Sequence, residues 1–184
     1  SALRRLAKPR RGRTVVVSDS AARRLAADAD VIGRGALPAD VLDRARDLLL
    51  DHLGVTLAGA VEESSVVLRR GLASLGATGQ ATVVGTSERL APAHAALANG
   101  AAAHAIEMDD THLGGSVHLA ASVFPAALAA AELSPTSGRT LLHAAVAGYE
   151  VAARLAVALD PAAHYRRGFH PTGTCGTFGA TAAA

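Results

Sequence analysis

Residues 38–60 read PADVLDRARDLLLDHLGVTLAGA, and this stretch decides the fold class. Proline stands at its start, where a helix tolerates the missing N–H group. Apolar residues then recur three and four positions apart, which is the spacing of a helix with one buried face. The stretch therefore predicts an amphipathic helix from Pro38 to about Ala60. Its glycines, Gly54 and Gly59, are expected to let another helix approach closely.

The rest of the chain also has the composition of a helical protein. Half of the 184 residues are hydrophobic, but about a quarter of the chain is alanine, and only 3% is aromatic. Alanine loses little side-chain entropy in a helix, whereas strands favour β-branched and aromatic residues. The length fits one domain. We therefore expect an all-α domain packed through small side chains, and all-β folds are excluded.

Proline, glycine and capping residues divide the remaining sequence into elements. Ser20 or Asp19 can cap a first helix that runs to about Val31. Further helices are predicted at about 64–75, 92–110, 119–133 and 138–159, and from Pro171 to the end of the chain. The stretch ATVVG at 81–85 is the single expected strand, and the segment 160–170 is expected to be irregular.

Charge is distributed unevenly along the chain. Residues 1–13 carry six of the 18 Lys and Arg residues and no acid, whereas the other 12 face 16 Asp and Glu. We therefore expect a basic flexible arm at 1–17 and a helical domain at 18–184. No aromatic residue is interleaved with the cations of the arm, so nucleic-acid binding is not expected.

Cysteine content and apolar runs bear on the cellular compartment. The single cysteine, Cys175, excludes an internal disulfide framework and a cysteine-based zinc site. No secretory signal pattern is visible. The apolar run at 116–133 contains His118 and Pro125 and is interpreted as a buried helix rather than a membrane span. The expectation is a soluble cytoplasmic protein.

The first chemical cluster is NGAAAHAIEMDDTHLGGSVH at 99–118. On a continuous helix, His104, Glu107 and Thr111 would share one face, Asp110 would border it and Asp109 would point away. Histidine beside carboxylates is a workable acid–base pair. The alternative is a solvated helix end followed by a glycine turn. A metal site is also conceivable, but no recognised ligand spacing is present, so no metal is expected; the residues considered for it are His104, Glu107, Asp110, His112 and His118.

The second cluster is HYRRGFHPTGTCGTFG at 164–179. Arg166 and Arg167 precede His170 and a helix start that is spaced by glycines. Arginine and the free N–H groups of a helix N-terminus both bind anions. The glycines at 173, 176 and 179 leave room for a ligand or another helix, and the alternative is that they serve packing alone.

Four stretches in this order together resemble the MmgE/PrpD family, which includes 2-methylcitrate dehydratase, cis-aconitate decarboxylase and iminodisuccinate epimerase. They are LLDHLGVTLAG at 49–59, AALANGAAAHAIEMDDTH at 95–112, AGYEV at 147–151 and GFHPTGT at 168–174. The resemblance implies a helical domain that full-length members join to a smaller α+β lid domain, which is expected to be absent from this chain. It also implies dimers, no organic cofactor, and small di- or tricarboxylate substrates.

The resemblance further implies site residues. Glu107 matches the family's carboxylate position, Thr111 its hydroxyl position, and His118 and His170 its two histidines. We expect His118, His170 and Glu107 to be catalytic, with the histidines moving a proton or holding a carboxylate and Glu107 orienting a histidine or water. The expected substrate-binding residues are Thr111, His104, Asp110, Arg166 and Arg167, the arginines on chemical grounds alone.

The predicted function is a lyase that dehydrates or decarboxylates a small polycarboxylate, or the N-terminal part or subunit of such an enzyme. A homo-oligomer, or a second polypeptide that supplies the lid, would complete it. One alternative is a non-catalytic helical module for binding or assembly that keeps the family fold. A second is an epimerase or isomerase of a related acid.

Overall fold

The computed structural model describes residues 20–134 and 136–184. The predicted arm at 1–17 lies outside these residues and stays a prediction. The elements in chain order are α1 (Ala21–Arg34), α2 (Ala39–Gly59), α3 (Glu63–Ser74), β1 (Thr78–Thr82), β2 (Arg89–Leu90), α4 (Pro92–His104), α5 (Ala120–Leu133), α6 (Gly138–Ala158), α7 (Pro161–Arg166) and α8 (Pro171–Ala183). The predicted all-α class is confirmed.

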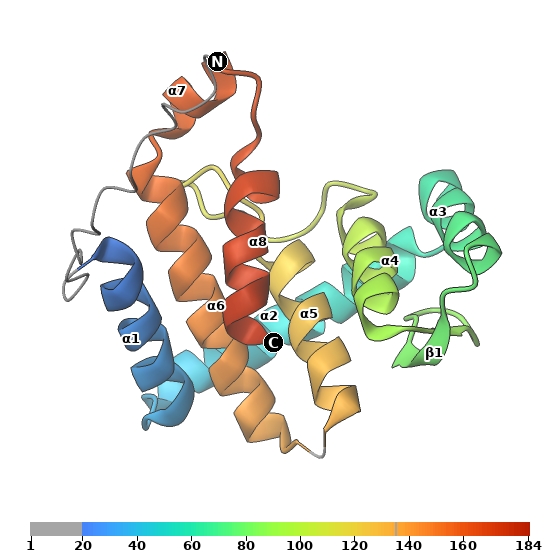
Figure 1. The fold of residues 1–184 in the computed structure, drawn as a ribbon, viewed down its shortest axis with the longest axis horizontal. Helices are drawn as coiled ribbons and strands as arrows, with labels where there is room; N and C mark the ends of the chain where they lie inside the picture. The colour runs from blue at the N-terminus through green and yellow to red at the C-terminus, as the bar shows by residue number, and fades with distance from the viewer. Residues whose placement is uncertain (1–19, 135) are drawn as a thin grey trace, which may run out of the picture.

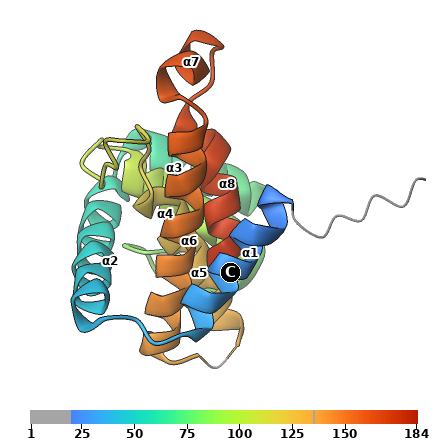
Figure 2. The same ribbon diagram turned by 90° about the vertical axis from the view of Figure 1, so that its left-hand side faces the viewer.

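The helices form one packed group around α6 and α8, which lie side by side at its centre (Figure 1). Helix α1 packs on one side of α6, and α5 and then α4 follow on the other side. Helix α2 runs across the back of this group and contacts α4, α5 and α6; Figure 2 places it along one edge. The short helix α7 projects at the top of both views.

Small residues set the distances between these helices. A Cβ added at Gly148 of α6 would lie 2.7 Å from the carbonyl oxygen of Gly179 in α8. A Cβ at Gly59 of α2 would lie 1.9 Å from the carbonyl oxygen of Ala102 in α4, so the predicted close approach at Gly59 is confirmed. The same prediction for Gly54 is wrong, because no atom lies within 4 Å of a Cβ there.

The core consists mostly of alanine and valine around one buried aromatic ring. Phe124 of α5 is 1% exposed and packs with Val123, Ala127 and, from α6, Ala145. The imidazole of His52 on α2 lies against Phe124, with ring centroids 5.4 Å apart. The alanine-rich composition therefore serves a core with little room between helix backbones.

The strand prediction was only partly right. The observed strand β1 begins three residues before the predicted range 81–85 and pairs antiparallel with β2, which sequence patterns did not indicate. A two-residue strand has no alternation to detect. The Asn99 side chain joins the hairpin to α4, because its Oδ1 accepts from the Val84 N–H and its Nδ2 donates to the Thr82 carbonyl, both at 2.9 Å.

Most helix boundaries match their predictions, and Ser20 caps α1 by accepting from the Arg23 N–H. Two predictions were wrong. The helix expected at 92–110 ends at His104, and the segment 160–170, expected to be irregular, contains α7. Asp160 caps α7 by accepting from the Ala163 N–H, and Pro161 occupies the first position of that helix.

Among the described residues, α6 is long and apolar enough to cross a membrane by length and composition alone. It packs against α1, α5 and α8, and the interior helix of a globular domain passes the same test. The apolar helix α5 is shorter, at 14 residues.

Candidate active site

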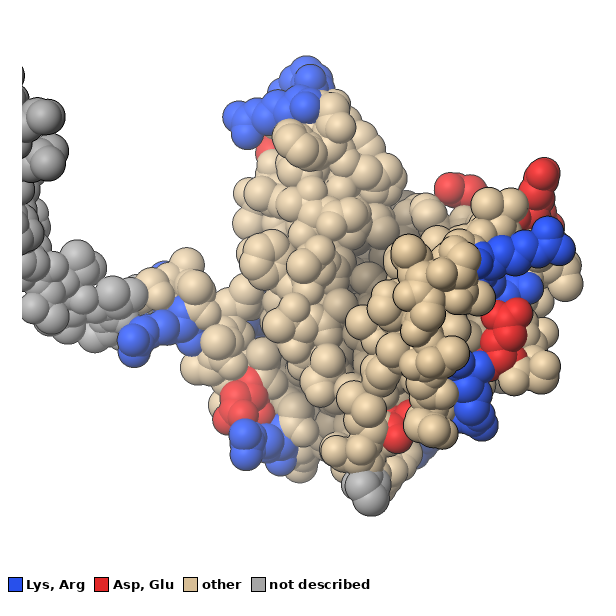
Figure 3. Space-filling model, turned by 45° about the vertical axis from the view of Figure 1, so that its right-hand side comes forward, with Lys and Arg blue, Asp and Glu red and all other residues tan. Residues whose placement is uncertain are grey.

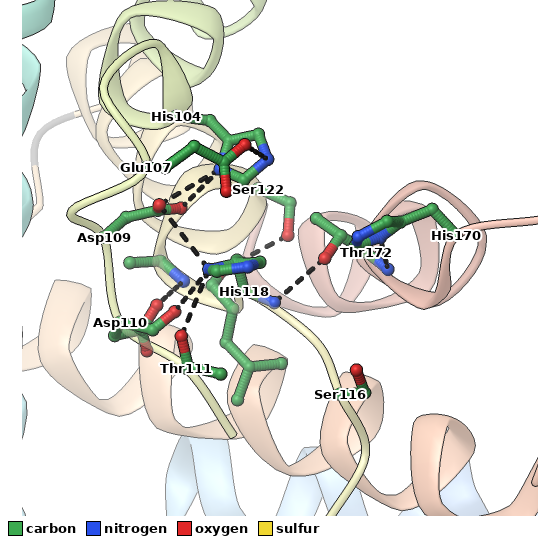
Figure 4. A network of polar contacts seen from close by, with 12 residues as sticks. His104, Glu107, Asp109, Asp110, Thr111, Ser116, His118, Ser122, His170 and Thr172 are labelled. Atoms are coloured by element: carbon green, nitrogen blue, oxygen red, sulfur yellow. Dashed lines mark hydrogen bonds and ion pairs between the residues drawn. The ribbon is translucent and has the colours of Figure 1, made fainter. Parts of the chain in front are cut away.

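Three parts of the chain meet in a cluster of histidines, the candidate active site. His104 is the last residue of α4, His118 lies in the loop before α5, and His170 immediately precedes α8. Figure 4 shows His118 between the other two. The ring centroids of His104 and His118 are 4.8 Å apart, and those of His118 and His170 are 6.3 Å apart. The two clusters found in the sequence therefore form one site.

Helix α4 ends earlier than predicted, so the residues of the first cluster that follow His104 lie in a loop. Glu107 has a φ of 54°, in the left-handed region, so the chain leaves the helix and turns back. The prediction that His104, Glu107 and Thr111 share one helix face is therefore wrong. The loop nevertheless brings them together: Glu107 Oε1 lies 3.5 Å from His104 Nε2, and Thr111 Oγ1 lies 3.4 Å from His118 Nδ1.

Asp109 lies at the centre of the cluster, and the prediction that it points away is wrong. Its side chain is completely buried. Both of its carboxylate oxygens lie 3.0 Å from His104 Nδ1, and Oδ1 lies 3.5 Å from His118 Nδ1. Sequence analysis missed this residue because the side-chain directions of a continued helix do not apply to the loop.

The contacts of His118 determine which ring nitrogen is free. Its Nδ1 lies 3.0 Å from the backbone carbonyl oxygen of Asp110, which can only accept a hydrogen bond. Nδ1 therefore carries the hydrogen, and in the neutral ring Nε2 has the lone pair. The backbone N–H of His118 donates to Thr172 Oγ1 at 2.9 Å, which ties the loop to the first turn of α8.

His170 is held in the opposite tautomer. It caps α8, and its Nδ1 accepts from the Thr172 N–H at 3.1 Å. In the neutral ring, Nε2 must then carry the hydrogen. Nε2 lies 3.2 Å from the hydroxyl of Tyr165, which in turn lies 3.1 Å from Ser116 Oγ. Tyr165 was not predicted as a site residue, although it lies in the second cluster.

Asp110 turns away from the histidines toward the start of α5. Its Oδ1 accepts from the Ala120 N–H at 2.8 Å. Burial raises the pKa of Asp110, and the Ala120 hydrogen bond opposes the shift. With Thr111 and Tyr149, Asp110 lines a cavity of about 580 Å³ between the loop and α2. Its clearest role in the structure is to hold α5 against the loop that carries His118.

Arg166 and Arg167 are exposed at the end of α7. Within the described chain, neither side chain forms a hydrogen bond or ion pair with the histidine cluster. Figure 3 shows cations at the tip formed by α7 and a largely uncharged face below it. The cluster itself opens to solvent, since the Glu107 side chain is 72% exposed.

The same cluster could hold a metal ion. His104, Glu107 and His118 each offer a ligand atom, and these atoms lie within 4.8 Å of one another. Two imidazoles and a carboxylate are donors that zinc accepts. The sequence expectation of no metal rested on linear spacing, and the loop brings these ligand atoms together despite that spacing.

Comparison with known proteins finds a family that matches this chain. A family model described as the MmgE/PrpD N-terminal domain matches residues 23–184. That range contains all four stretches on which the sequence resemblance rests, together with every member of the histidine cluster.

Several relatives are named as cis-aconitate decarboxylases or as proteins like them. A cis-aconitate decarboxylase-like protein, oryM, of Aspergillus oryzae is 35% identical over 155 residues, which cover 80% of this chain and 32% of the relative. Cis-aconitate decarboxylase of Aspergillus terreus is 33% identical over 154 residues, 80% of this chain and 31% of the relative. The Homo sapiens cis-aconitate decarboxylase is 34% identical over 155 residues, with shares of 82% and 32%. The chain spans about a third of the length of the curated relatives it matches.

Proposed function

Because the chain belongs to the MmgE/PrpD family, we propose that it contributes to lyase chemistry on a small di- or tricarboxylate, by dehydration or decarboxylation. It acts as the helical part of such an enzyme or as a subunit of one. The observation that carries the proposal is the geometry of His118. Its Nδ1 is held by the Asp110 carbonyl, and its Nε2 is left available to a substrate.

His118 is the proton-transfer group in this proposal. In a decarboxylation, the bond between carbon and the leaving carboxylate breaks, its electron pair moves into the remaining unsaturated acid, and CO₂ departs. Protonated His118 then gives its Nε2 proton to carbon. In a dehydration, neutral Nε2 instead removes a proton from the carbon beside a carboxylate, and hydroxide leaves with a proton from a second donor. Positioned acid–base groups contribute roughly 100- to 10,000-fold to such steps.

The neighbouring residues bind and orient the acid. Neutral His170 has its hydrogen on Nε2, so it donates a hydrogen bond, and Tyr165 beside it supplies a hydroxyl. Thr111 offers a second hydroxyl next to His118. Glu107 faces His104 Nε2 and fixes that ring or a water molecule. A substrate carboxylate is therefore held on the side of His118 that faces α8.

The residues of this chain contribute least to neutralising the negative charge of the substrate. Arg166 and Arg167 are the nearest candidates in the sequence, yet their side chains make no contact with the cluster within the described residues. A second copy of the chain, or another polypeptide that covers the exposed Glu107 side, would bring cationic groups to the carboxylates and exclude water.

The exposure of this site favours one alternative function. A helical module that binds or assembles without catalysis would also keep His118 ordered and Glu107 open to solvent. The distance between His118 and His170 favours another, because imidazoles 6.3 Å apart could exchange protons on two faces of one carbon. That arrangement would invert a stereocentre, as an epimerase does.

Proton NMR of the purified chain in heavy water tests these functions together. The acids to supply are cis-aconitate, citrate and 2-methylcitrate. A new alkene product indicates a lyase, and deuterium uptake at a stereocentre without elimination indicates an epimerase. A folded chain that consumes none of them contradicts stand-alone catalysis and favours the binding module.

The first prediction concerns His118→Gln. This variant is expected to lose at least about 100-fold of the turnover, because the proposal assigns the proton transfer to Nε2 of His118. His94→Gln, at the opposite end of α4 from His104, is the matched control and is expected to retain activity. Equal turnover by His118→Gln and the unaltered chain would remove His118 from the mechanism.

A further inference from the structure

We infer that Asp109 is a positioning residue that keeps a hydrogen on Nδ1 of His104 and acts together with the Asp110 carbonyl to keep one on Nδ1 of His118. The catalytic consequence of this inference rests on the proposed function. The tautomers themselves do not, and they can be measured separately.

The burial of Asp109 demands partners for its charge. Its side chain has no solvent exposure, and an unpaired carboxylate in such a place is strongly destabilising. His104 supplies the closest partner, with Nδ1 at 3.0 Å from both oxygens. His118 supplies the second, with Nδ1 at 3.5 Å from Oδ1. One carboxylate therefore serves two imidazoles.

Hydrogen-bond chemistry then fixes the tautomers. An ionised carboxylate only accepts, so the nitrogen that faces it must donate. At His118 the Asp110 carbonyl, 3.0 Å from the same Nδ1, imposes the same direction. Beside this carboxylate, one ligand atom each from His104, Glu107 and His118 lie within 4.8 Å of one another.

A third histidine near Asp109 does not compete for this role. His52 on α2 is fully buried, and burial lowers its pKa to about 4, although the charge of Asp109 opposes the shift. His52 is therefore neutral at physiological pH. The buried Asp109 carboxylate therefore faces His104 and His118, whose Nδ1 atoms lie 3.0 and 3.5 Å from its Oδ1.

Long-range proton–nitrogen NMR of labelled histidine side chains tests the inference in the unaltered chain. The expected spectrum has His104 and His118 with hydrogen on Nδ1, and His170 with hydrogen on Nε2. A His104 or His118 ring with no hydrogen on Nδ1 overturns the inference without any variant, so the test stands even if substitutions at Asp109 impair folding.

Asp109→Asn is the direct variant. Its amide places N–H groups where Oδ2 now faces His104 Nδ1, so His104 is expected to switch its hydrogen to Nε2. The Asp110 carbonyl is expected to keep the hydrogen of His118 on Nδ1. Asp110→Asn is the matched control for the spectrum, because its amide oxygen can still accept from Ala120 and the tautomers should stay unchanged. Unaltered tautomers in Asp109→Asn overturn the inference.

Kinetics separate positioning from simple support of the fold. Asp109→Asn is expected to lower kcat roughly 10-fold or more with KM within about two-fold, since substrate contacts remain while the buried negative charge beside His118 is lost. A rise in KM alone overturns the positioning role. If the unaltered chain turns over no acid, stand-alone catalysis is contradicted, and the tautomer spectra still decide the inference.

Discussion

His52 makes the stability of the fold depend on pH. Its imidazole is 0% exposed, between α2 and Phe124 of α5, and Thr56 Oγ1 lies 3.5 Å from its Nε2. Burial lowers its pKa from 6.5 to about 4. The unfolded chain therefore takes up this proton at a higher pH than the folded chain, and acidification favours unfolding.

We predict the size and direction of that dependence. The stability linked to neutral His52 is complete above about pH 6.5 and is lost as the pH falls toward 4, by about 3 kcal/mol in all. Urea unfolding at several pH values measures it. His52→Gln should flatten the slope between pH 6.5 and 4, whereas the same slope in both proteins would contradict the assignment.

At the scale of single residues, sequence analysis did not predict the positions of Asp109 and Tyr165 in the site. His118, His170, Glu107 and Thr111 stood out because their chemistry is unusual in an alanine-rich chain. Asp109 was placed on the wrong side because its side-chain direction depends on where α4 ends. The proximity of Tyr165 to His170 depends on α7, which was not predicted.

At the scale of elements, the contact between α2 and α4 positions His104. Gly59 lies against the backbone of Ala102, in the last turn of α4, only two residues before His104. Any side chain at position 59 must push these helices apart. The stability of the fold and the placement of the site therefore depend on the same contact.

Two glycines on α2 provide a matched test of this contact. Gly59→Ala is expected to lower the free energy of unfolding by about 1–3 kcal/mol, because its Cβ meets backbone that cannot move aside locally. Gly54→Ala, in open space on the same helix, should raise it by about 0.5–1 kcal/mol. Urea unfolding measures both, and equal effects would contradict the packing described here.

Elements that proline and glycine delimit were predictable, and those without such signals were not. Helices α4, α6 and α8 begin at Pro92, Gly138 and Pro171. The end of α4 was missed because no helix breaker stands between His104 and Gly114. The hairpin strand β2 and the helix α7 are too short for any periodicity to show.

At the scale of the whole molecule, the chain brings distant segments to one surface. The loop after α4 and the first turn of α8 are joined by the hydrogen bond from His118 to Thr172. Sequence order alone could indicate that the two clusters belong to one family pattern, but not that their histidine rings lie 6.3 Å apart. That distance comes from the packing of α5, α6 and α8.

The deuterium content of the product formed from cis-aconitate in heavy water tests the central claim most directly. Because the imidazole exchanges its proton with solvent, proton transfer from His118 predicts one deuterium at a single carbon of each product molecule, formed at least about 100-fold more slowly by His118→Gln. Product that carries no solvent deuterium, or labelled product formed equally well by His118→Gln, would contradict the account.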